Sequence, residues 1–494
     1  MLSVVIFLPV VIGIVLATSR RLPAAIIRWV WVGTAGADLL LTLVLTVEPE
    51  TGRTLRGEQR WEWMPGIGSS YHVGVDGISV PLILLTSIIF LVCALWSVRA
   101  IDRPRPQAAL FLFLQSTCLG LFAAQDLILF FVFFDLSIVG MYFIIAGWGH
   151  GNHRQSALKF FLYTFLGSLA LLLGFIGLYL GATPHTFDMV ALSQAGAFTG
   201  TPLVAGLVLA AIVVGLAIKT PTFPFHSWLP PAHTDAPTIG SVVLASVLLK
   251  MGTYGFVRIA IPMLPDAWRS YAWVIVVLGL VSVLYGALVA LAQTDVKRMI
   301  AFTSINHMGY VILAVGAAGI IGSDTAAAQQ LAVTGAVTQM VSHGLITGAL
   351  FLLAGVFYDR TGSYDLRQYG GLARPAPRFA GFFAVASFAS LGLPGFSGFI
   401  AEFQIFTGSI GTTWWALFAL PGILITAVLL LRAFQRIFTG PTENLSPGFA
   451  DLRRHETIPL AILMGLSVIV GVFPGPLLAL IQPAARIVVE SLTP

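Results

Sequence analysis

Residues 127–147, LILFFVFFDLSIVGMYFIIAG, form a run of 21 residues that carries one charged side chain, Asp135. A helix needs about 20 mostly apolar residues to cross the hydrocarbon core of a lipid bilayer. The run therefore predicts a membrane-spanning helix with a carboxyl group near its middle.

The rest of the chain has the same character. Hydrophobic residues make up 57% of the 494 residues and charged residues 10%, whereas soluble domains carry about 25% charge. We identify fourteen candidate spans, at residues 2–17, 26–46, 78–98, 107–124, 127–147, 158–180, 203–225, 239–262, 271–293, 300–322, 330–357, 378–409, 412–436 and 457–481. The sequence thus predicts an all-α polytopic membrane protein with about fourteen transmembrane helices, forming a single membrane domain over residues 1–494.

Several classes of site are excluded by what the chain contains. Cys93 and Cys118 lie in apolar runs far apart in the sequence, so they supply neither a disulfide framework nor a four-cysteine zinc or iron–sulfur site. The net charge of +5 includes no basic tract, which does not suggest nucleic acid. There is no phosphate-binding loop of the ATPase type, so ATP does not drive transport.

The basic residues predict the orientation of the chain. Connections after odd-numbered spans hold 18 lysines and arginines, and those on the other side hold 6. Because basic residues concentrate on the cytoplasmic side, we expect both termini on the outer side. Arg20 and Arg21 follow the first apolar run instead of preceding it, so this run is interpreted as an uncleaved helix and not as a signal peptide.

Two spans contain breaks, KTPTFPFHSWLPP at 219–231 and LGLPGFSG at 391–398. Proline removes a backbone donor, and in lipid such breaks persist only where protein or water satisfies the freed backbone. Breaks at matching places in the seventh and twelfth spans suggest two inverted five-helix repeats, at about 107–262 and 271–436, as in transporters. The alternative is a pair of proline-kinked structural helices.

Two of the four lysines, Lys219 and Lys250, lie inside apolar spans, whereas nearly all of the 22 arginines lie in loops or at span ends. A buried lysine can lose its proton, and arginine cannot. Asp135 and Glu402 share the apolar setting, where each charge costs about 2.5–3.5 kcal/mol. This pattern favours a site that gains and releases protons over buried ion pairs that fix helix register.

Histidines extend this set. His307 and His343 lie in the tenth and eleventh spans and are candidates for proton transfer, although one backbone carbonyl could satisfy a structural imidazole. A structural interpretation is favoured for His226 and His233, which lie in the polar connection after the seventh span. Charged residues at predicted helix ends are interpreted as solvated caps or orientation signals; they are Asp126, Asp295, Lys297 and Arg298.

Long, uncommon motifs run through almost the whole chain: YHVGVDGIS (71–79), FFDLSIVGMYFIIAGWG (133–149), KTPTFPFHSWLPPAHTDAP (219–237), LLKMGTYGFVR (248–258), TDVKRMIAFTSINHMGYVIL (294–313), MVSHGLITGALFLLAGVFYDR (340–360), YGGL (369–372) and ASLGLPGFSGFIAEF (389–403). With these motifs the chain resembles the antiporter-like proton-pumping membrane subunits of respiratory complex I, most closely the chain M type of bacterial NADH–quinone oxidoreductase. The choice of the M type also rests on the length, which leaves no long C-terminal lateral helix.

The resemblance implies a proton-transfer role for six residues, one each on helices five, seven, eight, ten, eleven and twelve: Asp135, Lys219, Lys250, His307, His343 and Glu402. Glu402 would be the exit carboxylate. One departure matters, because the family usually has glutamate where this chain has Asp135. Aspartate is one methylene shorter, so we expect a different distance to Lys219 and a bridging water between the two groups.

The resemblance also implies that this chain binds no cofactor and that NADH, FMN, iron–sulfur clusters and quinone belong to partner subunits. Expected partners are membrane lipids and other membrane-arm subunits, including antiporter-like neighbours and the lateral helix of the distal subunit. The expected location is the cell inner membrane, with periplasmic termini. Two alternatives remain, a large subunit of a multi-subunit cation/proton antiporter and the membrane arm of an energy-converting hydrogenase. A purely structural scaffold would leave the buried lysines unexplained.

Overall fold

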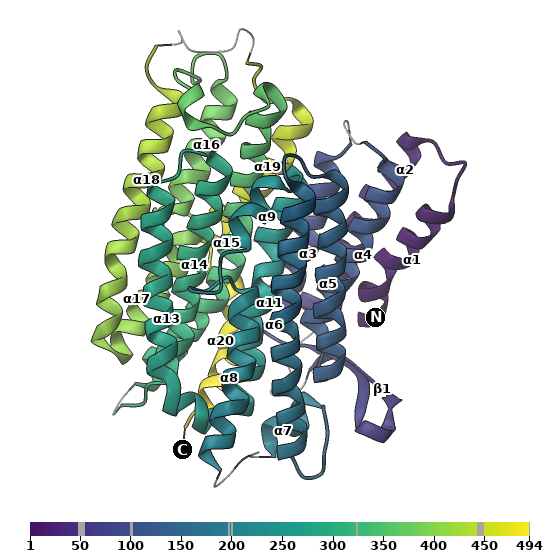
Figure 1. Ribbon diagram of the computed structural model, residues 1–494, viewed down its shortest axis with the longest axis vertical. Coiled ribbons are helices and arrows are strands. Elements are labelled where there is room, and N and C mark those ends of the chain that lie inside the picture. The colour runs from purple at the N-terminus through teal and green to yellow at the C-terminus, as the bar shows by residue number, and fades with distance from the viewer. Residues whose placement is uncertain are drawn as a thin grey trace.

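The computed structural model describes residues 1–47, 55–98, 102–195, 198, 201–322, 325–441 and 449–493. Long helices run side by side along the longest axis of the molecule (Figure 1). Within the described residues, twelve helices are long and apolar enough to cross a membrane. The prediction of a helical, multi-pass membrane protein is therefore confirmed.

The elements of the first half are, in order, α1 (Leu2–Thr18), α2 (Ala24–Val47), β1 (Arg56–Met64), η1 (Pro65–Ile67), β2 (Ser69–Val75), α3 (Ser79–Trp96), α4 (Pro104–Ala123), α5 (Leu127–Trp148), α6 (His153–Gly181), α7 (Met189–Gln194), α8 (Pro202–Lys219), α9 (Leu229–Asp235), α10 (Thr238–Val243), η2 (Leu244–Leu248), α11 (Leu249–Gly255), η3 (Phe256–Ala260) and α12 (Ile261–Met263). The helix from α10 to α12 is continuous, with π-helical turns at η2 and η3.

The second half contains α13 (Pro265–Leu291), α14 (Val296–Ala318), α15 (Ala326–Thr361), η4 (Leu366–Gln368), α16 (Pro377–Ser390), α17 (Ser397–Thr412), η5 (Trp414–Ala419), α18 (Leu420–Phe438), α19 (Arg454–Val472) and α20 (Gly475–Glu490). Buried apolar side chains from most of these helices and from the first half form one core. Helices α14 and α15 lie at its centre, because their membrane-length segments are buried throughout.

Each of the fourteen predicted spans overlaps a helix, and the two largest overruns past a helix end are in the seventh and the fourteenth. The seventh was expected to reach residue 225, but α8 ends at Lys219. The fourteenth was expected to reach residue 481, but α19 ends at Val472 and a separate helix, α20, begins at Gly475. Apolar side chains continue across this second break, and Pro474 interrupts the helix there by removing a backbone donor.

The polar connection between the second and third spans contains an antiparallel hairpin, β1–β2, that the sequence interpretation did not predict. Trp61 of β1 stacks on Tyr71 of β2, with ring centroids 5.2 Å apart. Aromatic cross-strand pairs of this kind stabilise a hairpin. The all-α description therefore needs this one correction among the described residues.

The hairpin marks one face of the molecule. Ser3 donates its backbone N–H to Gln59 in β1, which brings the start of the chain to this face. Near the C-terminus, the backbone carbonyl of Leu492 accepts a hydrogen bond from Arg269 at the start of α13. Figure 1 shows the C-terminus and α7 at the same end of the helices as the hairpin. We call this end the hairpin face.

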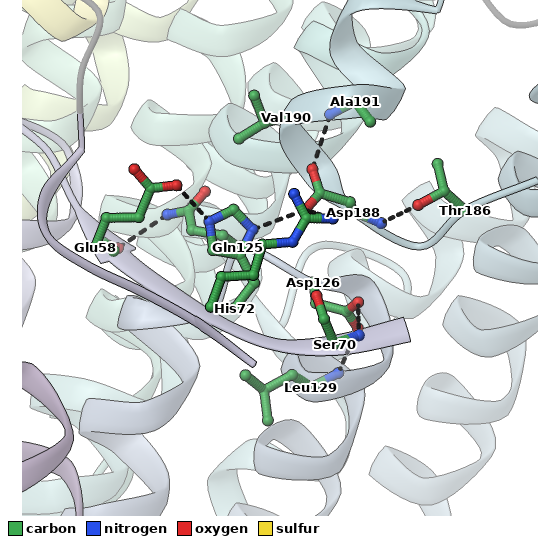
Figure 2. A network of polar contacts seen from close by, with 12 residues as sticks. Glu58, Ser70, His72, Gln125, Asp126, Leu129, Thr186, Asp188, Val190 and Ala191 are labelled. Carbon is green, nitrogen blue, oxygen red and sulfur yellow. Dashed lines mark hydrogen bonds and ion pairs between the residues drawn. The ribbon is translucent and has the colours of Figure 1, made fainter. Parts of the chain in front are cut away.

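His72 of β2 fastens the hairpin to the connection before α7. Its ring nitrogens lie 2.7 Å from Asp188 Oδ2 and 2.8 Å from Glu58 Oε1, and Figure 2 shows the imidazole between the two carboxylates. Burial lowers the pKa of His72, but the hydrogen bonds and charges of Asp188 and Glu58 outweigh burial and raise it above the ordinary value. The imidazolium form is therefore favoured, with both ring nitrogens donating.

Candidate functional site

Lys219 is the last residue of α8, because TPTFP follows it and ends the helix. Its side chain is 1% exposed. The ammonium nitrogen donates to Ser137 Oγ on α5 at 3.1 Å and lies 4.7 Å from the ring centroid of Phe134. The broken span thus directs a buried cation at the middle of α5.

Asp135 lies on the same stretch of α5, between Phe134 and Ser137. It attracts Lys219 electrostatically. The described residues form no ion pair between the two side chains, and the buried Asp135 Oδ1 has no hydrogen-bond partner there. The two residues of the predicted pair are therefore neighbours in this structure, but their side chains are not in direct contact as an ion pair.

Lys250 follows the π-helical turn η2 and is fully buried. Its ammonium nitrogen lies 2.6 Å from the carbonyl oxygen of Ala245 and 2.7 Å from Nδ1 of His343 on α15. The wider π turn leaves the Ala245 carbonyl able to accept from the lysine, and such turns frequently occur at functional sites. Nδ1 must be unprotonated to accept from an ammonium group.

A small cavity opens beyond His343. Its walls include His343, His307 of α14, Gln339 and Glu402 of α17, and about 10 Å³ is open to the centre of a water molecule, roughly the space of one water. The rings of His343 and His307 have centroids 5.6 Å apart. Nε2 of His343 is buried and has no hydrogen-bond partner among the described residues.

His307 lines this cavity and also lies beside the carboxyl group of Glu402. Its Nδ1 lies 3.2 Å from Gln339 Nε2 and 3.5 Å from Glu402 Oε1, and its Nε2 lies 3.4 Å from Ser390 Oγ. Nδ1 can accept from Gln339 only without a proton and can donate to Glu402 only with one. The same atom therefore has a partner for either protonation state.

The second break positions Glu402. Gly392, between α16 and α17, has φ +68, and a Cβ placed on it would come 2.5 Å from Glu402 Oε2. The absence of a side chain at Gly392 lets the carboxylate pack against the broken backbone. Glu402 itself is 7% exposed.

No hydrogen bond among the described residues joins Lys219 directly to Lys250. The neighbouring Thr220 is fully buried, and its Oγ1 has no partner in the described structure. A Cβ on Gly252 would collide with this hydroxyl oxygen, so Thr220 Oγ1 faces the helix that carries Lys250. The six predicted residues thus form two groups. Asp135 lies beside Lys219, and the other four follow one another in space in the order Lys250, His343, His307 and Glu402.

The helix-end residues are only partly as expected. Asp126 and Asp295 do cap α5 and α14 by accepting from backbone N–H groups, and Arg298 is exposed. Asp126 was expected to be solvated, but it is fully buried where the hairpin covers the start of α5. The expectation that Lys297 is solvated is wrong, because it is fully buried and donates to the carbonyl oxygen of Ala236 at 2.6 Å. Tertiary packing covers this lysine, which local sequence does not reveal.

The two connection histidines differ from each other. His226 lies 3.1 Å from the hydroxyl of Tyr285, which fits a structural role. His233 is fully buried and stacks on Phe351 with ring centroids 4.4 Å apart, yet neither ring nitrogen has a partner among the described residues.

Sequence reasoning missed several polar residues of the interior. Ser137, Gln339 and Ser390 are uncharged, and nothing in their local sequence marks them. Asp38 did carry a signal, since it is a charged residue within the predicted second span, and the structure buries it completely.

The family model described as NADH:quinone oxidoreductase/Mrp antiporter, TM, matches residues 124–429. This match includes both broken spans and all six predicted site residues. The chain belongs to this family. NADH-quinone oxidoreductase subunit M of Rickettsia prowazekii is 39% identical over 88% of this chain and 87% of its own length. The Rhodobacter capsulatus subunit M is 37% identical over 99% of this chain and 96% of its own length.

Solved structures agree with the family. A chain of respiratory complex I from Thermus thermophilus superposes with a TM-score of 0.90, is 30% identical and covers both chains completely. A chain of the Mrp complex from Dietzia has a TM-score of 0.84 at 22% identity, covering 100% of this chain and 99% of its own, and shares the fold. The resemblance inferred from the motifs is confirmed: this is an antiporter-like membrane subunit of the proton-translocating type.

Proposed function

We propose that this subunit exports protons in an NADH–quinone oxidoreductase through Asp135, Lys219, Lys250, His343, His307 and Glu402. The observation that carries the proposal is the buried series from Lys250 to Glu402, in which each side chain contacts the next or shares a cavity with it. Such intramembrane ionisable groups are costly and characteristically mark proton pathways.

His343 would pass a proton by using both ring nitrogens. When Lys250 gives a proton to Nδ1, a cationic imidazolium forms, and it restores neutrality by releasing the proton on Nε2. Nε2 has no partner among the described residues, and the ring lines the cavity that also contains His307 and Glu402. The proton therefore leaves on the side of the ring that faces the exit.

His307 would then deliver the proton to Glu402. Accepting a proton on Nδ1 breaks the hydrogen bond from Gln339 and creates a donor 3.5 Å from Glu402 Oε1. The reverse exchange resets the histidine for the next proton. Glu402, beside the α16–α17 break, would release the proton to the outer side.

The Asp135–Lys219 pair would control the protonation of Lys219. When the carboxylate approaches, it stabilises the ammonium form, and when it withdraws, burial favours neutral lysine and releases the proton towards Lys250. One charge moved against 100 mV costs about 2.3 kcal/mol. Disrupting a buried ion pair changes energies by about 3–5 kcal/mol, which is enough to drive the step.

The assembly around this subunit belongs to the same proposal. Electron transfer among NADH, FMN, iron–sulfur clusters and quinone takes place in partner subunits, so this chain is a non-redox component. Neighbouring antiporter-like subunits and the lateral helix of the distal subunit contact it in the inner membrane. Both termini lie on the periplasmic side, and helices at 107–262 and 271–436 form inverted repeats, each with one broken helix.

A second candidate, a subunit of a cation/proton antiporter, shares the fold. The two differ in their partners. Purification of the tagged native complex should recover iron–sulfur subunits, and recovery of small membrane subunits alone would favour the antiporter.

The proton path is tested by Lys219→Ala in the assembled complex. We expect most proton pumping to be lost, measured as quenching of a pH-sensitive dye, while native gels show intact assembly. Failure to assemble, with unchanged pumping per assembled complex, would instead make Lys219 a structural residue.

A further inference from the structure

Asp38 joins three helices outside the series described above. It lies on α2 and is fully buried. Its Oδ2 accepts a hydrogen bond from Ser87 Oγ of α3 at 2.9 Å and another from Gln115 Nε2 of α4 at 2.8 Å. Thr42, one turn along α2, contacts Ser87 Oγ at 3.0 Å. Four polar side chains therefore form a closed cluster within the N-terminal spans.

The cluster contains no cation. Among the described residues, no lysine, arginine or histidine pairs with Asp38, and the contacts of its side chain are to neutral groups. An isolated ionised carboxylate in such surroundings is so unfavourable that the group instead binds a proton or a cation. Because Asp38 is buried and its side-chain neighbours are neutral, we expect a proton or a cation to be bound at this carboxyl group.

Two oxygen atoms indicate where that ligand lies. Asp38 Oδ1 and Gln115 Oε1 are both buried and have no hydrogen-bond partner in the described structure. Both atoms are acceptors. Their two side chains are already joined by the hydrogen bond that Gln115 Nε2 donates to Asp38 Oδ2. A carboxylic acid and a primary amide form a ring of two hydrogen bonds, N–H to the acid carbonyl and acid O–H to the amide oxygen. One proton would thus satisfy both atoms.

We propose that Asp38 and Gln115 form a proton-binding site, with the proton on Asp38 Oδ1 and donated to Gln115 Oε1. The bound proton is resident and is not translocated, because the hydrogen bonds of the cluster lead to its own members and to adjacent backbone. The chain therefore holds two intramembrane aspartates of opposite type, a neutral Asp38 and a switchable Asp135.

The test compares neutral replacements in the intact complex. Asp38→Asn keeps the shape and supplies an N–H in place of the acid O–H, so assembly and pumping per turnover should change by less than about twofold. The swap Asp38→Asn with Gln115→Glu moves the acid to the other side chain and should also be tolerated. Asp38→Leu removes the partner of Gln115 Nε2 and leaves Ser87 Oγ only Thr42 as a side-chain partner, so it should reduce assembly. Asp135→Asn is the matched control, in which pumping should be lost.

Infrared difference spectra give a second readout. The native complex minus Asp38→Asn should show the carbonyl band of a protonated carboxyl group, and the swapped variant should regain it. A carboxylate band, loss of pumping per complex in Asp38→Asn, or failure of both Asp38→Asn and the swap to assemble would each overturn the proposal. Turnover that depends on Na⁺ in the native complex but not in Asp38→Asn would also overturn it, because the ligand would then be sodium.

Discussion

Lys250 Nζ lies 2.7 Å from Nδ1 of His343, and these two buried bases come from positions 93 residues apart in the chain. Two bases that share one hydrogen bond hold one proton between them, because a second positive charge at this distance would be strongly unfavourable in a medium of low dielectric. The pair can therefore exchange a proton without either side chain moving far. This property distinguishes it from an ion pair, in which charge separation holds the proton on one side.

Lys250→Arg preserves the positive charge but removes a group that can release its proton. We expect the complex to assemble and coupled proton pumping to fall severely. Pumping in proteoliposomes, divided by quinone reductase turnover, measures the effect. Full coupled activity in this variant would mean that a fixed positive charge is sufficient beside His343.

Asp135→Asn keeps the shape of the side chain and removes its charge, so Lys219 loses the partner that stabilises its ammonium form. Coupled activity should drop sharply. Asp135→Glu restores the residue usual in the family and should retain substantial activity, although an extra methylene in a packed interior can cost about 1–3 kcal/mol. If Asp135→Asn pumped like the native protein, the carboxyl group of α5 would be dispensable.

Glu402→Ala should abolish most pumping while assembly persists, since it removes the carboxyl group beside His307 that we propose as the proton exit. Glu456→Ala is the matched control. It removes a buried glutamate whose carboxylate oxygens lie 2.7 Å and 2.9 Å from Arg360 Nη2, and breaking such a pair costs about 3–5 kcal/mol. We expect Glu456→Ala to reduce the amount of assembled complex and to leave pumping per complex intact. Equal losses of pumping per complex in both variants would contradict a specific role for Glu402.

Gly392→Ala should displace the Glu402 carboxylate, because the new Cβ would come 2.5 Å from Oε2. Gly395→Ala provides the control within the same break. Its φ of +97 is at least as unfavourable for alanine as the φ of +68 at Gly392, but nothing lies within 4 Å of its Cβ position. Both variants should lose stability by more than about 1 kcal/mol, and Gly392→Ala alone should lower pumping per assembled complex. Equal pumping in the two variants would show that the position of Glu402 is unimportant.

The attachment of the hairpin should depend on pH. Because the pKa of His72 is raised above 6.5 in the folded chain, its contribution to stability is complete below pH 6.5 and is lost as the pH rises through the folded-state value. Amide hydrogen exchange in β2 of the intact complex should therefore accelerate at high pH beyond its intrinsic increase. In His72→Gln this additional dependence should disappear, and its persistence would exclude His72 as the titrating group.

The sequence predicted the elements of the fold because the bilayer imposes a simple rule on each segment separately. A run of about 20 apolar residues must be helical to satisfy its own backbone, and proline in 219–231 and 391–398 predicted where helices break. The hairpin at residues 56–75 was not predicted because it lies outside the apolar spans, where this rule does not apply. The fourteenth span was predicted to continue past Val472 because hydropathy alone does not detect a short break between two apolar helices.

By itself, the sequence determined that Lys219, Lys250, Asp135 and Glu402 lie in apolar spans, since depth in the membrane follows from position within a span. Only the tertiary structure decided which groups meet. It placed His343 between Lys250 and the cavity of His307, placed Gln339 beside His307, buried Lys297 and joined Asp38 to Gln115. The physical reason is that a contact between helices depends on their rotation and register, which are fixed by packing over the whole bundle. Local sequence specifies the face of a helix but not the side chain it meets.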